Sequence, residues 1–424
     1  MNFKKKVLKN GLRIIVVPIA GAPSVTVMAL VEAGSEYETK EKNGISHFLE
    51  HMCFKGTEKR PNSIDISREL DSIGSAYNAF TSYEVTGYYA KAHPKHFNKI
   101  LDVVSDIYLN PTFPEAEIEK EKGVIIEEIN MYEDMPKEKV GMVYEALLYG
   151  DNPAGWSILG PKQNIKTMKR ADFLDYRKTH YVPAKTVIVV SGNVDANTAF
   201  KKIENIFGSM SQGKVIKKKK TIEKQNMPAL KVGEKDTDQA HLIIGVRAFD
   251  LHNKRMPTLR LLSTILGNGM SSRLFQKMRE ELGICYYVRS GISDLSDHGH
   301  FHISAGVDRT RLALAVKGIL EELRKIKNQK VSAAELRKAK DFLIGGMYLG
   351  LESSDALANF YGSQEIMREK IKTPKEVERE IEKVTAHELQ KVAQTILVNK
   401  GLNMALVGKC KKEEENDLKK ILRI

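Results

Sequence analysis

Alternating apolar and polar residues, together with longer runs of helical spacing, divide the chain into recurring elements. Alternation over 24–31 and 241–247 predicts strands, because successive side chains of a strand point to opposite faces. Asn10-Gly11, a pair typical of tight hairpin turns, precedes a further strand over 12–18. Strands interspersed with runs of helix are typical of α+β domains, in which helices pack on a mostly antiparallel sheet. The long helices are expected at 95–108, 115–131, 312–326 and 333–349.

The order of these elements occurs twice. Gly192 closes an apolar strand that leads into a helix, and Gly408 closes a similar strand in the second half of the chain. Three such matches in one order, at offsets of 215–218 residues, predict a duplicated fold. The other two matches are helical segments, beginning at residues 116 and 171, with counterparts beginning at 334 and 386.

The repeat predicts two homologous α/β sandwich domains over 1–212 and 229–424, joined by a linker over 213–228. The linker is polar and poor in apolar residues, as expected of a tether between domains. Its dense run of lysines, at 217–220, is expected to lie in solvent.

Length and composition limit the class of protein. A chain of 424 residues with 42% hydrophobic residues is ordinary for a globular protein and too long for one core. The three cysteines are widely separated, which favours a reducing compartment over a disulfide framework. We see no signal peptide and no apolar run near the roughly 20 residues of a membrane helix. A cytoplasmic location without a membrane partner is therefore expected.

The net charge of +13 raises the possibility of a nucleic-acid partner. However, the lysines are spread along the chain, and no zinc-finger, RRM or P-loop spacing accompanies them. Specific nucleic-acid binding is therefore the less favoured alternative.

The segment His47-Phe-Leu-Glu-His51 carries the candidate chemistry. On a helix, residues three and four apart share a face, so His47, Glu50 and His51 can converge. Two imidazoles suit tetrahedral zinc, which takes nitrogen ligands at about 2.0–2.1 Å. A neighbouring carboxylate can then act as general base towards a zinc-activated water. H-x-x-E-H is the inverzincin order. A polar helix that faces solvent could have the same five residues, so the choice between a metal site and a solvated helix depends on the rest of the chain.

Two histidines leave a catalytic zinc short of a third protein ligand. Glu121 and Glu128 are two helical turns apart and share a face, so one can bind the metal while the other holds a ligand in place. At the offset of the repeat they correspond to Ala339 and Gly346, and the second half has no H-x-x-E-H. The metal site is thus expected in the first half and a metal-free copy in the second. The candidates for the third ligand are Glu119, Glu121, Glu127 and Glu128.

The stretch 44–57 resembles the zinc motif of the pitrilysin/insulinase metallopeptidases. The resemblance is strongest to the single-clamshell branch, which includes the mitochondrial processing peptidases and bacterial homologues of this length. It continues at 78–82, 121–129 and 270–286, and so covers nearly the whole chain. It implies a half-clamshell that works as a homodimer or as a heterodimer with an inactive homologous subunit. It also implies a zinc metalloendopeptidase acting on extended peptides or unfolded segments.

The resemblance assigns roles to individual residues. His47, His51 and Glu128 would hold one zinc ion per chain, Glu128 being selected because it follows His51 by the family's spacing of 77 residues. Glu50 would be the general base. Glu121 would support the ligands and belongs, with Glu50, to the expected catalytic set.

The resemblance also implies contacts with substrate. Arg279 and Tyr286 would complete the catalytic set from the metal-free half, with Tyr287 as an alternative to its neighbour. A strand edge would pair with the substrate backbone, a mode that tolerates many side chains. Its residues are Asn78, Ala79, Phe80 and Thr81.

Two alternatives stay open. The first is a non-proteolytic scaffold subunit, like the core proteins of the respiratory bc1 complex that resemble these peptidases; the intact motif argues against it. The second concerns His298, His300 and His302, which alternate along one strand and share a face. They could bind a metal, but an exposed or partner-facing stripe is the favoured interpretation.

Overall fold

The computed structural model describes residues 2–367 and 370–424 and divides into two compact units. Unit 1 comprises Met1–Ile129, Ser157–Lys219 and Tyr348–Pro374. Unit 2 comprises Asn130–Trp156, Lys220–Met347 and Lys375–Ile424. Each unit is assembled from segments of both halves of the sequence.

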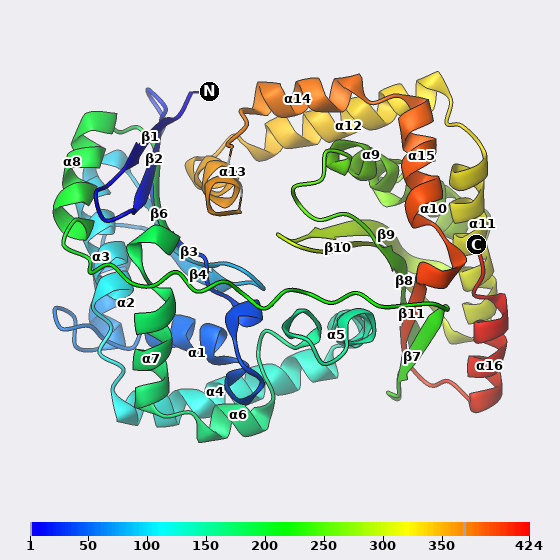
Figure 1. Ribbon diagram of the computed structural model, residues 1–424, viewed down its shortest axis with the longest axis horizontal. Helices are drawn as coiled ribbons and strands as arrows, with labels where there is room; N and C mark the ends of the chain where they lie inside the picture. Colours follow the sequence, from blue (N-terminus) through cyan, green and yellow to red (C-terminus); the bar gives the residue numbers. More distant parts are fainter. Residues whose placement is uncertain (1, 368–369) are drawn as a thin grey trace. The chain divides into compact units, whose positions relative to one another are not determined.

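Unit 1 is built on a six-stranded sheet with the order β1-β2-β6-β3-β5-β4 (Figure 1). All neighbouring strands are antiparallel except β2 and β6. The central strands β3 and β6 are buried along their whole length, which explains their continuous apolar sequence. The strands are β1 (Lys4–Val7), β2 (Arg13–Pro18), β3 (Val25–Val31), β4 (Ala76–Thr81), β5 (Thr86–Ala92) and β6 (Thr186–Gly192).

Helices cover this sheet. The amphipathic α3 packs on β3 and β5, and α8 packs on β2. Helix α4 begins in unit 1 and ends in unit 2. The helices are α1 (Ile45–Met52), α2 (Ser63–Asp71), α3 (Phe97–Leu109), α4 (Glu115–Asp134), α6 (Lys162–Thr167), α7 (Arg170–His180), α8 (Ala196–Phe207) and α13 (Ser354–Met367). The 3-10 turns are η1 (Ser35–Tyr37), η2 (Lys40–Lys42), η3 (Pro94–His96) and η5 (Pro183–Lys185).

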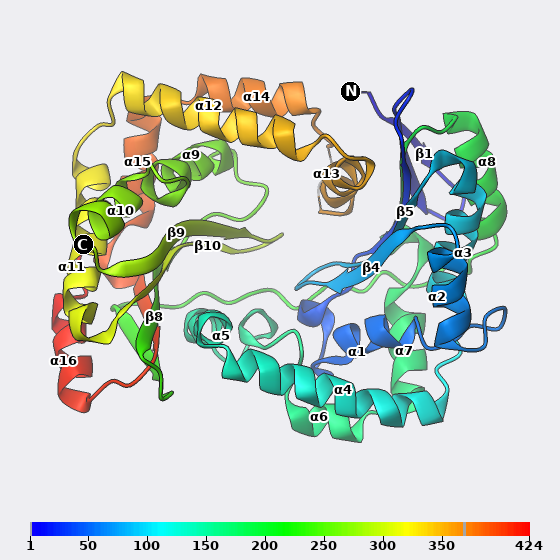
Figure 2. The ribbon, with the colours of Figure 1, turned by 180° about the vertical axis from the view of Figure 1, so that it is seen from behind.

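Unit 2 is built on a five-stranded sheet with the order β7-β11-β8-β10-β9, whose strands are labelled in Figure 1, and Figure 2 shows the sheet from behind. Only the pair β7 and β11 is parallel. One apolar core joins this sheet to α9, α11 and α15. The strands are β7 (Ala229–Gly233), β8 (Gln239–Arg247), β9 (Cys285–Asp294), β10 (Gly299–Asp308) and β11 (Leu402–Val407). The helices are α5 (Pro136–Tyr149), α9 (Met256–Gly267), α10 (Arg273–Phe275), the π-helical turn η6 (Gln276–Glu281), α11 (Leu312–Asn328), α12 (Ala333–Gly350), α14 (Pro374–Lys383), α15 (Ala386–Ile396) and α16 (Lys412–Ile421), with 3-10 turns η4 (Pro153–Gly155), η7 (Arg309–Arg311) and η8 (Asn399–Gly401).

The two sheets share one topology, which confirms the expected α+β fold with two homologous parts. In each sheet a parallel pair is followed by three antiparallel neighbours, so β2, β6, β3, β5 and β4 correspond to β7, β11, β8, β10 and β9. The expected long helices occur as α3, α4, α11 and α12, each within three residues of the expected bounds. The expected hairpin is formed by β1 and β2.

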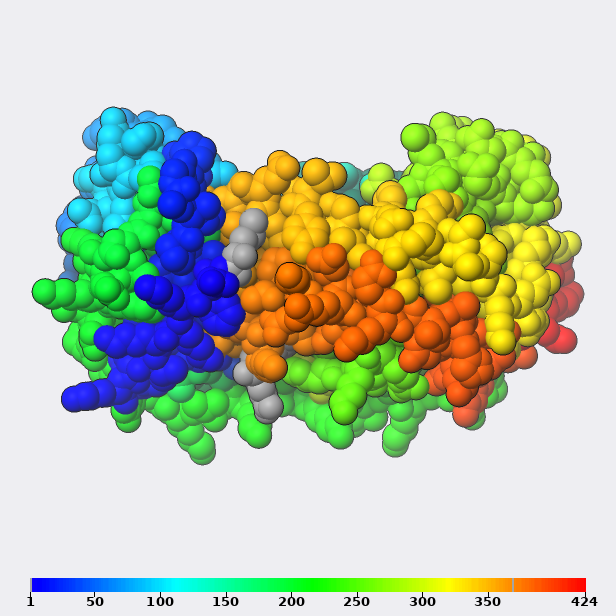
Figure 3. All heavy atoms as spheres, turned by 90° about the horizontal axis from the view of Figure 1, so that it is seen from above, coloured from blue at the N-terminus to red at the C-terminus, as the bar shows by residue number. Residues whose placement is uncertain are grey.

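Each half of the sequence supplies one helix to the sheet formed by the other half, and we call this arrangement the exchange of α13 and α5. Helix α13, from the second half, packs on β3 and β6 of unit 1. Gly362 permits the close approach, since a Cβ there would lie 2.7 Å from Leu30 Cδ1. Glu365 accepts a hydrogen bond from Lys5 at 2.8 Å, and Figure 3 shows this orange segment against the blue N-terminal hairpin. Helix α5, from the first half, packs on β8 and β11 of unit 2.

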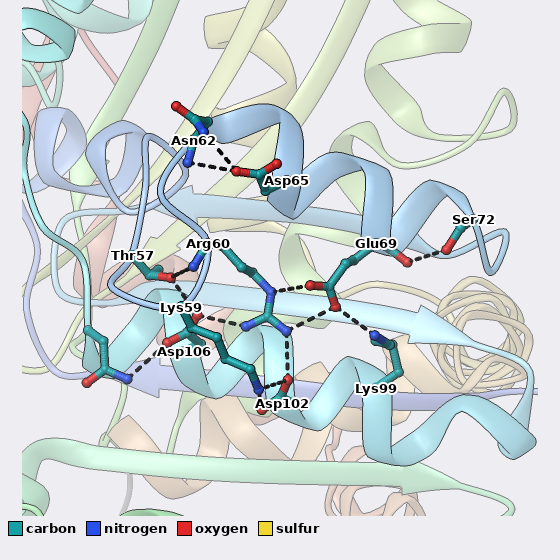
Figure 4. A network of polar contacts seen from close by, with 11 residues as sticks. Thr57, Lys59, Arg60, Asn62, Asp65, Glu69, Ser72, Lys99, Asp102 and Asp106 are labelled. Atoms are coloured by element: carbon teal, nitrogen blue, oxygen red, sulfur yellow. Dashed lines mark hydrogen bonds and ion pairs between the residues drawn. The ribbon is translucent and has the colours of Figure 1, made fainter.

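A buried arginine fastens the loop that follows α1 (Figure 4). Arg60 is only 1% exposed. Its guanidinium donates to Glu69 of α2 at 3.0 Å, and to Asp102 and Asp106 of α3 at 2.6 and 2.7 Å. Thr57, in the same loop, donates to Asp106 at 2.6 Å. The chain leaving α1 is therefore tied to two other helices of unit 1.

The stretch expected to be a linker has no helix or strand between residues 213 and 228, but one part of the expectation was wrong. Lys217, Lys219 and Lys220 are exposed, whereas the side chain of Lys218 is only 8% exposed. Its ammonium group contacts the buried carboxylates of Glu36 and, at 2.8 Å, Glu84. Buried carboxylates require a cation, which is why this lysine leaves the solvent.

None of the helices in residues 2–367 and 370–424 combines the length and apolar composition needed to cross a bilayer.

Candidate metal centre

The motif lies on α1, a helix whose sides have different surroundings. Phe48, Leu49 and Met52 are fully buried. The helix begins at Gly44, whose φ of +100° is unfavourable for other residues. A Cβ at Gly44 would also lie 2.6 Å from the carbonyl oxygen of Leu159. Packing therefore fixes both the start and the rotation of the helix.

The second element of the site is α4. Ile118, Ile125 and Ile129 are its buried apolar positions. Glu121, seven residues before Glu128, is also buried, whereas Glu127 is exposed. The structure therefore brings Glu121 and Glu128 to the motif and leaves Glu127 outside.

Three potential ligand atoms converge in unit 1. His47 Nε2 and His51 Nε2 are 3.2 Å apart, and they lie 3.5 and 3.7 Å from Glu128 Oε2. Tetrahedral zinc with ligands at about 2.0–2.1 Å would require ligand–ligand separations of about 3.3–3.4 Å. These residues form a group of metal-ligating type among the described residues. The donor set and its spacing fit one zinc ion.

Hydrogen bonding prepares one of these imidazoles as a ligand. His51 Nδ1 donates to Glu121 Oε1 at 2.8 Å, which leaves the lone pair of His51 on Nε2. Lys55 donates to the other oxygen of Glu121 at 2.6 Å. Burial tends to raise the pKa of Glu121, but the hydrogen bonds from His51 and Lys55 together have the larger effect and lower its pKa. Glu121 is therefore an ionised acceptor that fixes the ring of His51.

The other imidazole is held neutral. Burial and the neighbouring His51 lower the pKa of His47 to about 3. A neutral imidazole has the free lone pair that metal binding requires. A metal ion bound by Nε2 of both rings would also lie against the carboxylate oxygen of Glu128.

Glu50 lies beside these ligands and is held from a different element. Thr81, the last residue of β4, donates to Glu50 Oε2 at 2.6 Å. Burial raises the pKa of Glu50, although the hydrogen bond from Thr81 opposes the increase. A carboxylate with a raised pKa is better suited to accept a proton near neutral pH.

The expected substrate strand is an open edge. β4 is the last strand of its sheet and pairs only with β5 among the described residues. Asn78 is exposed, and its side chain accepts from the backbone N–H of Ala79 at 2.9 Å. Phe80 is half-buried, and Thr81 contacts Glu50. One end of the open edge therefore reaches the candidate base.

Arg279 and Tyr286 belong to unit 2. Arg279, on η6, donates to the backbone carbonyl of Tyr286 at 2.7 Å, and the side chain of Tyr286 is 60% exposed. The hydroxyl of Tyr287 instead lies 3.1 Å from Nδ1 of His241. Of the two tyrosines, Tyr286 has the more exposed side chain.

The histidines at and just before the start of β10 correct an expectation. His298 and His300 are buried, not exposed, and His302 is half-buried. They lie under α5, where the ring of Tyr144 is 5.4 Å from that of His300 and the hydroxyl of Tyr149 is 3.3 Å from its Nδ1. These three imidazoles together form no metal-ligating group within the described part of the chain. The stripe is polar because it packs against tyrosines.

Sequence reasoning missed three side-chain contacts that support this site. Lys55 follows the end of α1, so helical spacing does not connect it to Glu121. Thr81 was expected to pair with substrate through its backbone, and the contact of its hydroxyl with Glu50 was not predicted. Glu38 lies in a loop that precedes α1 and accepts hydrogen bonds from backbone N–H groups at the start of that helix. A glutamate placed shortly before a glycine-initiated helix was the available signal for Glu38.

The chain matches two descriptions of one protein family. Insulinase (Peptidase family M16) matches residues 13–162, and Peptidase M16 inactive domain matches residues 167–343. The first match contains the motif and Glu128, and the second contains Arg279 and Tyr286.

Several bacterial proteins are similar over nearly their whole length. The uncharacterized zinc protease YmxG of Bacillus subtilis is 36% identical over 396 residues, which cover 93% of this chain and 95% of that protein. An uncharacterized zinc protease of Rickettsia felis is 35% identical over 93% of this chain and 95% of its own length. An uncharacterized zinc protease of Mycobacterium leprae is 33% identical, with coverage of 95% and 90%.

Solved structures share the fold. A protease from Helicobacter pylori superposes with a TM-score of 0.90 at 24% identity, covering 96% of this chain and 99% of that one. A structure described as a peptidase M16 inactive domain, from Pseudomonas fluorescens, gives a TM-score of 0.88 at 17% identity, with coverage of 97% and 98%. With whole-length relatives above 30% identity and both domain descriptions matched in order, the chain belongs to the insulinase family, peptidase family M16.

Proposed function

We propose that this chain is a zinc metalloendopeptidase that hydrolyses peptide bonds in extended peptides or unfolded segments. The observation that carries the proposal is the convergence of His47, His51 and Glu128 within 3.7 Å, with Glu50 beside them. The names of the bacterial relatives as zinc proteases support it.

His47, His51 and Glu128 would hold one zinc ion per chain. Zinc bound there would supply Lewis-acid polarisation of the peptide carbonyl and would acidify a water molecule. Glu121 keeps the ring of His51 oriented, with the proton on Nδ1. Lys55 holds Glu121 in turn.

Glu50 is the residue that moves protons in this proposal. Its carboxylate takes a proton from the attacking water and passes it to the amine that leaves. Thr81 holds one oxygen of Glu50 and leaves the other for the water. Glu50 is therefore the residue whose loss separates catalysis from metal binding.

The substrate would bind by strand addition. The free edge of β4, Asn78 to Thr81, offers backbone groups to an extended peptide, and such pairing tolerates many side chains. Arg279 and the accessible Tyr286 would provide further contacts from the metal-free copy. A folded substrate would not present a free strand.

Two wider proposals accompany this function. The enzyme acts as a homodimer, or as a heterodimer with an inactive homologous subunit, which sedimentation of the purified chain would distinguish. It works in a reducing compartment such as the cytoplasm, consistent with the free thiols of Cys53, Cys285 and Cys410.

The test compares the wild type with Glu50→Gln on a pool of quenched peptides. We expect the variant to retain zinc, measured by metal analysis, and to lose at least about 100-fold in kcat, because general base catalysis contributes roughly 10²–10⁴. Removal of zinc with a chelator should abolish cleavage by the wild type, and added zinc should restore it.

Glu127→Gln is the matched control, since it makes the same chemical change at the exposed neighbour of Glu128. It should leave both zinc content and kcat unchanged. Full activity in Glu50→Gln would overturn the mechanism, and a wild type that binds no zinc and cleaves no peptide would favour the scaffold alternative.

A further inference from the structure

Helix α1 carries two of the proposed zinc ligands. A buried carboxylate outside the metal centre accepts hydrogen bonds from the first residues of this helix. Glu38 lies between η1 and η2 and is only 6% exposed. Its Oε1 accepts from the backbone N–H of Ser46 at 2.8 Å. Its Oε2 accepts from the backbone N–H of Gly44 at 2.7 Å and from the side-chain amide of Asn43 at 2.8 Å. Both oxygens are thus used.

These contacts meet a specific need of α1. The first backbone N–H groups of a helix have no partner within it, and the end they form is electropositive. An eight-residue helix has few internal hydrogen bonds with which to resist fraying. A carboxylate at this end therefore stabilises α1 through both hydrogen bonding and charge.

The position of the contact connects it to the metal centre. Ser46 directly precedes His47, so the bond from Ser46 N to Glu38 fixes the backbone one residue before the first histidine. Other groups locate the same residues: Ser46 Oγ lies 2.7 Å from the hydroxyl of Tyr176, and Gly44 packs on Leu159. Of these partners, Glu38 is the one that carries a charge.

We propose that Glu38 is a positioning residue of the metal centre, which holds the first turn of α1 so that His47 and Glu50 keep their places relative to His51 and Glu128. The role rests on the proposed function, because it acts through the zinc ligands and the base. Glu38 touches neither metal nor substrate in this scheme.

Removing the charge has a predictable local result. In Glu38→Gln, one carboxylate oxygen becomes an NH₂ group. Whichever oxygen is replaced, the new donor faces an N–H donor, from Ser46 on one side or from Gly44 and Asn43 on the other. At least one hydrogen bond is lost and replaced by repulsion, so the first turn of α1 must shift.

The experiment measures zinc affinity by competition with a chelator, and kcat and KM on one quenched peptide, at pH 8. Burial raises the pKa of Glu38 to about 7, so its carboxylate is ionised at that pH. For Glu38→Gln we expect zinc affinity to fall by about 10–100-fold, the range found when groups that orient metal ligands are removed. We also expect kcat to fall at least about 10-fold, with KM within about two-fold, because α1 carries the base and not the substrate strand.

Glu41→Gln is the matched control, an exposed glutamate three residues away on η2. It should match the wild type in zinc affinity, kcat and KM. Should Glu38→Gln fail to fold, Glu38→Asp decides by the same readouts, since it keeps the charge but cannot reach all three donors. It should lose at least about three-fold in zinc affinity.

The outcomes separate the two proposals. A Glu38 variant equal to Glu41→Gln in both zinc affinity and kcat would overturn the positioning role alone, provided that the wild type binds zinc and cleaves. A wild type that does neither would overturn the proposed function, and with it the role of Glu38.

Discussion

Thr81 is the residue at which the open strand edge and the candidate base meet. Its hydroxyl donates to Glu50 at 2.6 Å and lies 3.4 Å from the hydroxyl of Thr86. A peptide that paired with β4 would therefore lie along the strand that also restrains Glu50. Thr81 is thus expected to matter through its side chain, whereas its neighbours on β4 would act through the backbone under the proposed function.

Thr81→Val keeps the shape of the side chain and removes the hydroxyl. We expect kcat to fall by about 10-fold or more with zinc content unchanged, because a hydrogen bond to a charged group contributes about 1.5–3 kcal/mol. Thr81→Ser keeps a hydroxyl and should stay within a few-fold of the wild type. Equal kcat values for the Val and Ser variants would show that this hydrogen bond has no role in the reaction.

The parts of the site that could be predicted from sequence are those fixed by local periodicity. His47, Glu50 and His51 fall within two turns of one helix, and the seven-residue spacing of Glu121 and Glu128 places both on one face. Lys55, Thr81 and Glu38 reach the site from a turn, a strand end and a loop. Helical spacing does not apply to them, so only the tertiary structure shows their contacts.

At the scale of elements, Arg60 joins the loop after α1 to α2 and α3 (Figure 4). Its guanidinium pairs with three carboxylates, and one of them, Asp106, is itself buried. A planar group with several donors can satisfy three acceptors at once, which an ammonium group cannot do in the same geometry.

Arg60→Met should lower the free energy of unfolding of unit 1 by about 3–5 kcal/mol, because it leaves Asp106 buried without its cation. The free energy of unfolding of Arg60→Lys should lie between those of Arg60→Met and the wild type. The control is Lys59→Met, which removes an exposed ammonium group from Asp102 and should cost less than about 1 kcal/mol. Urea unfolding of the three variants checks this order, and equal effects at positions 59 and 60 would contradict it.

The burial of His302 beside Tyr144 of α5 makes the stability of unit 2 depend on pH. Burial lowers the pKa of His302 from 6.5 to about 4, so its imidazole is neutral in the folded chain. In the unfolded chain it binds a proton below about 6.5. Its contribution to stability is therefore complete above about pH 6.5 and is lost progressively as the pH falls towards about 4.

His302→Phe keeps a ring beside Tyr144 and removes the titration. Between pH 6.5 and pH 4, we expect the free energy of unfolding of the wild type to fall by roughly 1–3 kcal/mol more than that of the variant. Trp156, the single tryptophan of the chain, lies in unit 2, so its fluorescence during urea unfolding reports on this unit. Parallel pH profiles for the two proteins would rule out the contribution of His302.

At the scale of the whole molecule, the exchange of α5 and α13 makes each half of the sequence incomplete. The face of β3 and β6 near Leu30 and Val189 is covered by α13, and the apolar face of β8 and β11 is covered by α5. A fragment of residues 1–219 has α5 but lacks α13, and a fragment of residues 220–424 has the opposite deficiency.

We expect each fragment, expressed alone, to aggregate or to bind a hydrophobic dye, because an apolar sheet face is exposed. Expressed together, the fragments should form a soluble one-to-one complex that binds zinc. Size-exclusion chromatography and metal analysis provide the measurement, with the uncut chain as the control. A monomeric fragment 1–219 that bound zinc as tightly as the whole chain would show that α13 is dispensable.

The sequence predicted the repeated elements but not this exchange. Neither α5 nor α13 was among the helices expected from the sequence. Periodicity can show only which face of a helix is apolar. It does not distinguish between two sheets of the same topology, and the boundaries expected at 212 and 229 follow the repeat in sequence. The choice of sheet depends on long-range contacts such as those of Gly362 with Leu30 and Val189.

The exchange also sets an order of events during synthesis. The last strand of the sheet of unit 1 ends at Gly192, yet the helix that covers β3 and β6 ends at Met367. At about 5–20 residues per second, the stretch between residues 219 and 367 takes about 7–30 s to translate. Throughout that interval an apolar face of the nascent chain has no partner. A chain whose synthesis stops within this stretch therefore contains all three proposed zinc ligands, but the unit that holds them is unfinished.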